Sequence, residues 1–399
     1  MNPLFCISII ETIHPPNTAG LKYLIIEYLK LELFKPVLWD MIRILILIIL
    51  TIAYANSNNN LFVIDSKLYS IQDEKKFLLA ENIVDIFNYD NKTYLVQQNG
   101  DNLTILKVTR YKFIPFINNK TFLRNVTTIK NLDNLIGVEV KKNKIFLVAE
   151  NKIITLNPNF KVENEIALVS FKTTFLSNSI LTLKNSSSYY IYDIENLNKP
   201  LFNVSKGFVL QISKINDYYL GLILQKSEED KLENEYTLEI AIFTNQNNTF
   251  HPYTLLQKKV KVSYDSIYYF IPIQNKYIIL QEKDESNIYE LDMTNKQNPS
   301  LKGFKKINSF YSYFEDNLLF TINSENLTIY DLQGNEFNPL LSIPNVNLIF
   351  YSKGTLYYLQ YNSQFGIWKL SSINFYKNSI TNNDLNIPFY SLPEEVIPL

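Results

Sequence analysis

The stretch YYIYDIENLNKPLF, residues 189–202, places an aspartate, a polar turn and a proline between two apolar runs. The same order returns in NIYELDMTNKQNPSLKGF, residues 287–304, and in LTIYDLQGNEFNPLLSIP, residues 327–344. An aspartate at a strand end accepts hydrogen bonds from turn amides, and a proline prevents the turn from continuing the ladder. The sequence therefore predicts one repeated β-hairpin. Its marker pairs, at offsets of 7, 7 and 8 residues, are Asp193 with Pro200, Asp292 with Pro299, and Asp331 with Pro339.

The spacing of this strand end predicts the number of repeats. Weaker copies lie near Gln72, Val108, Asn157, Thr244 and Ser371, which gives eight units at intervals of about 35 to 50 residues. Most units hold four short β-type segments, for example 135–140, 145–149, 152–157 and 163–169. Four strands form one propeller blade. We therefore expect an all-β propeller of about eight four-stranded blades, with seven as the alternative.

The ends of the repeat array are also informative. The first unit, which starts at Leu61, has no inner strand before it, and the segment 385–392 is a spare strand after the eighth unit. Because a ring that closes leaves no exposed sheet edge, we expect the C-terminal strand near 385–392 to fill the gap. The propeller then spans residues 56–399.

The N-terminal part of the chain carries an export signal. Residues 41–55, MIRILILIILTIAYA, have the basic start, short apolar core and small-residue end of a secretory signal peptide, which predicts cleavage after Ala55. We expect a secreted or cell-surface protein. Residues 1–40 are then an upstream mis-start or an amphipathic segment. An uncleaved N-terminal segment that anchors the protein to a membrane is the alternative.

Composition excludes several classes of function. Lys and Arg (38) balance Asp and Glu (39), so the basic patch of a nucleic-acid binder is not expected. The one cysteine, Cys6, precedes the predicted cleavage site, and His251, in an expected turn, is the one histidine after it. Disulfides, histidine-based metal sites and catalytic triads are therefore not expected, and we predict no catalytic residue, no metal and no cofactor.

The three marked hairpins resemble the LVIVD-type repeats of bacterial and archaeal surface propellers. In blade length the chain is also similar to quinoprotein-like envelope propellers, but it lacks their glycine and tryptophan signatures, and Trp368 is the one tryptophan after residue 55. Cofactor binding therefore does not carry over.

These observations favour a non-enzymatic scaffold or adhesin that binds protein or glycan at the cell surface. A structural envelope or appendage-associated subunit is the alternative. A hydrolase or lyase that uses carboxylates is a second alternative, favoured if acidic residues with a raised pKa meet at the axial mouth. Eight Asn-x-Ser/Thr sequons would accept glycan on an exported chain: Asn91, Asn102, Asn119, Asn125, Asn185, Asn203, Asn247 and Asn326.

Overall fold

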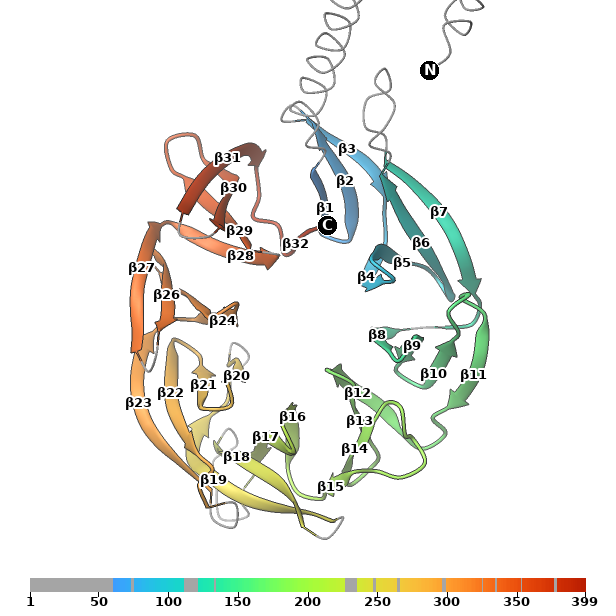
Figure 1. The fold of residues 1–399 in the computed structure, drawn as a ribbon, viewed down its shortest axis with the longest axis vertical. Coiled ribbons are helices and arrows are strands. Elements are labelled where there is room, and N and C mark those ends of the chain that lie inside the picture. Colours follow the sequence, from blue (N-terminus) through green and yellow to red (C-terminus); the bar gives the residue numbers. More distant parts are fainter. Residues whose placement is uncertain are drawn as a thin grey trace, which may run out of the picture. The chain divides into compact units, whose positions relative to one another are not determined.

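The computed structural model describes residues 60–399, apart from 73–74, 111–120, 133, 227–234, 247–248, 264–265, 296–298, 325, 334–335, 353 and 377–378. The described part is all-β and forms eight sheets of four antiparallel strands, arranged as the blades of a ring (Figure 1). The predicted propeller with eight blades is confirmed. The predicted signal peptide, residues 41–55, and the segment 1–40 lie outside the described residues. Within the described ranges no helix is long and apolar enough to cross a membrane.

Each blade is numbered from the one that holds the first strand. Blades one to four contain β32 (Val396–Pro398), β1 (Asn60–Ile64), β2 (Lys67–Gln72) and β3 (Lys75–Ala80); β4 (Ile83–Tyr89), β5 (Lys92–Asn99), β6 (Asn102–Arg110) and β7 (Thr121–Ile129); β8 (Leu135–Lys141), β9 (Lys144–Ala149), β10 (Lys152–Leu156) and β11 (Val162–Ala167); and β12 (Lys172–Ser177), β13 (Ile180–Lys184), β14 (Tyr189–Asp193) and β15 (Phe202–Val204). Blades five to eight contain β16 (Phe208–Ile215), β17 (Tyr218–Gln225), β18 (Glu235–Gln246) and β19 (Thr249–Lys261); β20 (Tyr268–Ile273), β21 (Tyr277–Glu282), β22 (Glu285–Asp292) and β23 (Ser300–Asn308); β24 (Tyr311–Glu315), β25 (Leu318–Ile322), β26 (Asn326–Gln333) and β27 (Glu336–Pro344); and β28 (Val346–Ser352), β29 (Thr355–Asn362), β30 (Ile367–Tyr376) and β31 (Ser379–Phe389).

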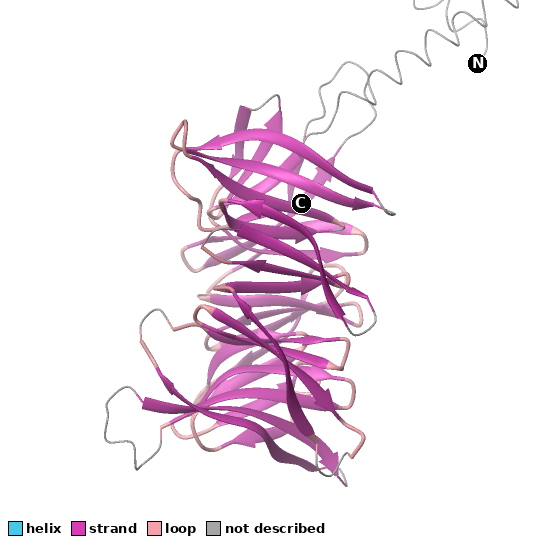
Figure 2. Cartoon of the chain, turned by 90° about the vertical axis from the view of Figure 1, so that its left-hand side faces the viewer, coloured by secondary structure: helices cyan, strands magenta, loops and turns pink. Residues whose placement is uncertain are grey.

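The connections give the ring two different faces. Within a blade the strands are antiparallel and follow one another outward, so every inner strand runs in the same axial direction. We call the face at which the inner strands begin the start face, and the face that carries the turns from inner to second strand the turn face. The strands run crosswise between these two faces, with loops at both edges (Figure 2).

The core lies between the blades. Eight apolar clusters of described residues each combine side chains from two neighbouring blades, and together they occupy all eight junctions. The second strand of a blade is buried on both sides, which explains why β17 and β21 are almost continuously apolar. Outer strands such as β11 are largely exposed. Sheet-on-sheet burial around the whole ring is therefore the main stabilising contribution.

Asparagine supplies many of the tight turns in a chain that has only nine glycines. Nineteen described non-glycine residues have positive φ, and ten of them are asparagines, for example Asn143 at 62° and Asn317 at 64°. Most of the inner turns consist of two such residues, which is the backbone that a type I′ hairpin requires and that asparagine tolerates better than most residues. Part of the asparagine content therefore has a conformational role.

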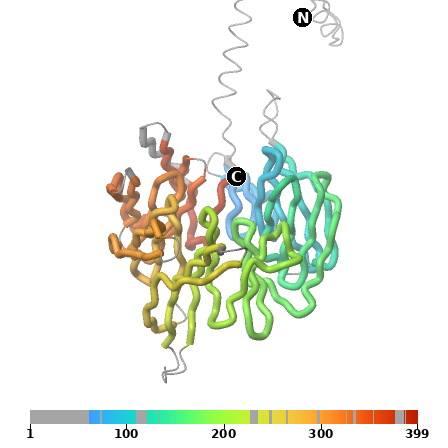
Figure 3. Tube along the Cα trace, turned by 60° about the horizontal axis from the view of Figure 1, so that its bottom comes forward, coloured from blue at the N-terminus to red at the C-terminus, as the bar shows by residue number. Residues whose placement is uncertain are grey.

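The ring closes through the last residues of the chain. β32 pairs antiparallel with β1, through Phe62 with Pro398 and Ile64 with Val396, and it supplies the inner strand that the first unit lacks. Figure 3 shows the blue start and the red end of the propeller side by side. The segment expected to close the ring was near 385–392. Its residues 385–389 instead form the end of β31, the outer strand of blade eight. The turn signal after Phe389 separates the two roles, and only 396–398 reach β1.

Candidate functional site

Bulges near the beginning of five inner strands shape the start face. In β4, β8, β12, β16 and β28 the pairing with the second strand skips one residue, and the extra residues are Val84, Ile136, Thr174, Leu210 and Asn347. All five are exposed. A bulge re-aims side chains that would otherwise alternate between the two buried faces of a sheet. The start face therefore presents side chains that the strand pattern alone would place in the core.

Large exposed apolar side chains gather on this face. The remaining large exposed apolar residues in the described part of the chain lie on the outer strands β3, β7, β11, β23 and β27. Val169 is 84% exposed, and Ile267, just before β20, is 56% exposed. We call the following set the apolar surface: Val84, Ile136, Val169, Phe208, Leu210, Ile267, Tyr311, Tyr361, Phe365, Tyr390 and Leu392.

Ion pairs lie on the same face. Lys172 Nζ is 2.7 Å from Glu150 Oε1, and Lys67 Nζ is 3.6 Å from Glu81 Oε1. Apolar groups accompanied by paired, solvent-exposed charges are the usual anatomy of a protein–protein interface. The opposite turn face has a different chemistry, because its inner turns consist of residues such as Asp90, Asn91 and Asn143.

Side chains that follow the bulges join neighbouring blades. Asp85 Oδ1 accepts a hydrogen bond from Ile86 N (2.6 Å) and Oδ2 accepts one from Val138 N in the next inner strand (2.7 Å). Gln211 Nε2 donates to Phe270 O (3.0 Å), and its Oε1 accepts from Phe270 N (2.9 Å). The inner strand β4 is therefore joined to β8, and β16 to β20, by hydrogen bonds from a side chain to the backbone.

A cavity of about 670 Å³ lies along the axis, between blades seven, eight, one and two. Its polar lining includes Asp85 from β4, Glu395 before β32, Tyr311 and Tyr313 from β24, and Tyr351 from β28. Burial raises the pKa of Asp85, although its two backbone hydrogen bonds oppose the shift. Burial and the carboxylates of Asp65 and Asp85 raise the pKa of Glu395. Two acidic groups with raised pKa values thus share the axial cavity.

Two of the tyrosines that line this cavity donate hydrogen bonds to carboxylates. The hydroxyl of Tyr313 donates to Glu315, and that of Tyr351 donates to Asp316 Oδ2 at 3.0 Å. Burial, followed by these acceptors, raises the pKa of both phenols, and burial raises that of Tyr311. All three rings are therefore neutral at physiological pH.

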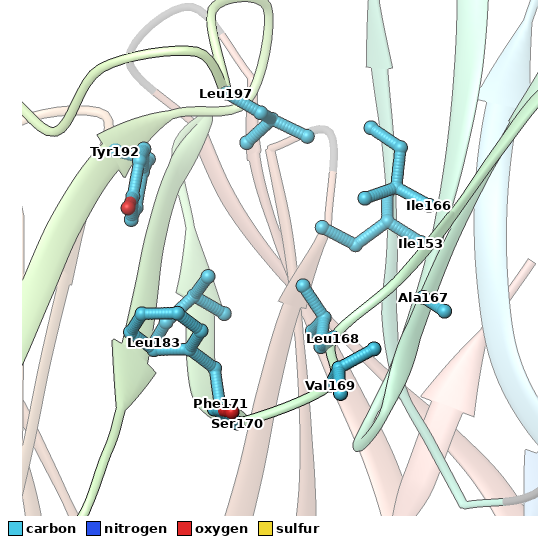
Figure 4. A pocket seen from close by; sticks show the side chains of 10 residues that line it. All are labelled: Ile153, Ile166, Ala167, Leu168, Val169, Ser170, Phe171, Leu183, Tyr192 and Leu197. Carbon is cyan, nitrogen blue, oxygen red and sulfur yellow. The ribbon is translucent and has the colours of Figure 1, made fainter.

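A second, smaller hollow lies at the junction of blades three and four (Figure 4). Its volume is about 300 Å³. Its lining is mostly apolar and includes Leu168 and Phe171, together with Tyr192 and Leu197. The outer strand of blade four, β15, has only three residues. Sequence reasoning gave no signal for either cavity, since both depend on the contacts between blades.

None of the marker residues of the repeated hairpin is among those that line the two cavities, although Asp193 directly follows Tyr192 of the smaller one. Asp193 Oδ1 accepts from Glu195 N (3.0 Å), and Asp292 Oδ1 accepts from Thr294 N (2.9 Å), so both aspartates cap their turns. Pro200 and Pro299 precede the outer strands β15 and β23. The third unit differs, because Asp331 and Pro339 lie inside β26 and β27, opposite Asn338 and Tyr330. Pro339 is compatible with the edge strand β27 because a bulge directly follows it in the pairing with β26.

The other predicted residues are spread around the ring. The sequon asparagines Asn91, Asn102, Asn125 and Asn203 are exposed, Asn185 and Asn326 are half-buried, and Asn119 and Asn247 lie outside the described residues. His251, expected in a turn, is instead paired with Thr244 in the edge strand β19, because the hairpin continues beyond it. No group of metal-ligating side chains exists within the residues that the structure describes.

Comparisons with known proteins give only distant similarities. No family model and no curated protein matches the sequence. Among solved structures, the chain is similar to Hsv2p of Kluyveromyces lactis, with 11% identity and a TM-score of 0.43 over 77% of this chain and 100% of that chain. The WD40 domain of SCAP from fission yeast matches with 11% identity and a TM-score of 0.43, over 78% of this chain and 88% of that chain.

A bacterial surface protein is similar at the same level. PorZ, a component of the type-IX secretion system of Porphyromonas gingivalis, matches with 15% identity and a TM-score of 0.38 over 82% of this chain and 44% of that chain. The resemblance to LVIVD-type repeats stays a prediction from the sequence.

Proposed function

We propose that this protein is an exported, non-enzymatic binding scaffold that holds a protein partner on its start face. The main support for this proposal is the apolar surface, which lies on the start face, whereas the turn face is polar. Aliphatic side chains such as Val84, Ile136 and Leu210 have no hydrogen-bonding atoms to offer a glycan, whereas they fit the desolvated centre of a protein interface. This favours protein over glycan as the partner at this face.

Rigidity supports the same proposal. Asp85 and Gln211 join the bulged strands β4 and β16 to the next blade, which favours a fixed arrangement of the exposed residues Val84 and Leu210 beside them. A preorganised surface loses little conformational entropy on binding, and its affinity is correspondingly higher. A scaffold needs this property more than an enzyme with a moving lid does.

The test is site-specific photocrosslinking in the native cells. A photoreactive phenylalanine analogue replaces Ile267 or Phe208 on the start face, Asp217 on the turn face, or Leu340 on an outer strand. We expect one discrete adduct of constant mass from the two start-face positions and none from the other two. The adduct is lost in the variant Leu210→Asp but kept in Leu340→Asp. Equal adducts from Asp217 or Leu340, or none from the start face, would overturn the proposal.

Export rests on residues 41–55 and has its own test. The expected result is an intact mass that begins at Asn56, found in the medium or at the cell surface, with added glycan mass on the exposed sequons Asn91, Asn102, Asn125 or Asn203 if the pathway glycosylates. A chain that begins at Met1 or Met41 without cleavage would favour the anchored alternative.

One observation favours a second candidate, the carboxylate-dependent hydrolase or lyase. Asp85 and Glu395 line one cavity, and both have raised pKa values. However, Asp85 already uses both oxygens to accept backbone N–H groups, which leaves Glu395 as the one carboxylate of this pair available to a substrate. Because only one carboxylate is available, we rank this candidate second. Hydrolysis of an oligosaccharide panel that Glu395→Gln abolishes would establish it.

A further inference from the structure

We propose that the axial cavity binds a small organic cation of the amine or quaternary ammonium class. This site is separate in chemistry from the protein-binding surface, although Val84 and Tyr311 contribute to both. The cavity volume, about 670 Å³, lies in the range of known small-molecule sites. No part of the proposed scaffold function requires this ligand.

The charge of the lining selects a cation. The described residues that line the cavity include the carboxylates of Asp85 and Glu395 and no lysine, arginine or histidine. Asp65, whose Oδ1 accepts from Glu394 N at 2.8 Å and from Glu395 N at 3.2 Å, adds a third carboxylate close by. Within the described part of the chain, the Glu395 side chain has no ion-pair partner. Burial, and then repulsion by Asp65 and Asp85, raises the pKa of Glu395, and a bound cation would relieve the repulsion.

The aromatic lining selects an organic cation over a metal ion. Tyr311, Tyr313 and Tyr351 are among the residues that line the same cavity, and Tyr313 and Tyr351 also pack on Phe320. The face of an aromatic ring attracts ammonium groups, and several rings around one site are a common device for binding quaternary ammonium ligands. Because Tyr313 and Tyr351 donate hydrogen bonds to Glu315 and Asp316, their rings also become richer in electrons. A hydrated metal ion would gain little from such walls, and an anion would be repelled.

The experiment is isothermal titration of the full-length protein with choline and with spermidine. The uncharged choline isostere 3,3-dimethylbutan-1-ol and a neutral disaccharide serve as comparison ligands. We expect saturable binding of at least one cation and at least about tenfold weaker binding of the isostere, because the charge is the recognised feature. Equal binding of choline and its isostere, saturable binding of the disaccharide alone, or no binding of either cation at 10 mM (roughly the weakest range that such a site would have) would overturn the proposal.

A pair of neighbouring variants localises the site. Glu395→Gln removes a carboxylate that lines the cavity, whereas Glu394→Gln removes the same charge one residue earlier, outside the lining. We expect Glu395→Gln to weaken cation binding about tenfold and Glu394→Gln to change it less than about twofold. Tyr311→Leu, which keeps an apolar side chain but removes a ring, weakens choline more than spermidine. Equal losses in the two glutamate variants would mean a diffuse field, and the site would be rejected.

Discussion

Tyr269 and Ser312 exchange two hydrogen bonds across the junction of blades six and seven. The Tyr269 hydroxyl donates to Ser312 O and accepts from Ser312 N, both at 2.9 Å. Burial raises the pKa of this phenol to about 12. Blades six and seven have no bulge at the beginning of their inner strands, and this tyrosine takes the place of the bulge-linked side chains that join other blades.

Tyr269→Phe removes both bonds and leaves a part-buried backbone amide and carbonyl without a partner. We expect a loss of about 1–3 kcal/mol in the free energy of unfolding. Urea unfolding measures it, with the exposed Tyr390→Phe as the control that changes nothing.

The same phenol adds a pH dependence. Because its folded pKa lies above the ordinary value near 10, its contribution is complete below about pH 10 and is lost as the pH rises towards 12. Stability of the native protein should therefore fall more steeply between pH 10 and 12 than that of Tyr269→Phe. Parallel curves would contradict this account.

Two glycines offer a matched pair of substitutions. Gly100 and Gly207 both have positive φ, +57° and +85°, but a Cβ at Gly207 would lie 2.8 Å from Leu224 O, whereas one at Gly100 would have nothing within 4 Å. Gly100→Ala should cost about 1–2 kcal/mol for the left-handed backbone alone. Gly207→Ala should cost at least about 3 kcal/mol, since the carbonyl must also move. Denaturant midpoints compare the two, and equal losses would show that the backbone shifts freely.

The turn face carries an ion network between blades three and four. Lys141 Nζ lies 3.0 Å from Asp193 Oδ1 and 3.3 Å from Glu195 Oε2. Burial alone would raise the pKa of Asp193, but the Glu195 amide and the Lys141 ammonium outweigh it and lower the pKa below its usual value. The contribution of this pair is therefore present at neutral pH and is lost as the pH falls through the lowered pKa.

Lys141→Met should thus destabilise the protein by about 0.5–1 kcal/mol at pH 7, as is usual for partly exposed pairs. The difference from the native protein should shrink below about pH 4. Thermal unfolding at pH 7 and pH 3 tests this, with Lys199→Met as the control. A difference that persists at pH 3 would assign the effect to packing.

The closing strand permits a local test of ring integrity. Val396 is fully buried, and β32 pairs with β1 over only three residues. Val396→Ala should cost about 1–2 kcal/mol. It should also accelerate hydrogen exchange at β1 more than at β9, on the far side of blade two. A uniform increase across all blades would show that closure is not a separate event.

The sequence predicted the repeat better than the site. Strand segments such as 145–149 are continuous apolar runs because second strands are buried on both sides, so their positions and the blade number could be inferred. The bulges could not be inferred, because a single extra residue such as Val84 inside an apolar run does not change the sequence pattern. Tyr269 and Ser312, 43 residues apart, meet only because two blades do. The closing segment was misplaced by a few residues, since 396–398 is too short to show a pattern.

The hydrogen bond from Glu394 N to Asp65 Oδ1 joins residues 329 positions apart in the chain. A ribosome that adds about 5–20 residues per second needs about 15–65 s to cover that distance. During this time β1 has an unpaired edge, while the blades that follow it are completed one after another. The first part of the propeller to be synthesised is thus the last to gain its inner strand, and nascent chains should depend most on protection by a chaperone at residues 60–64.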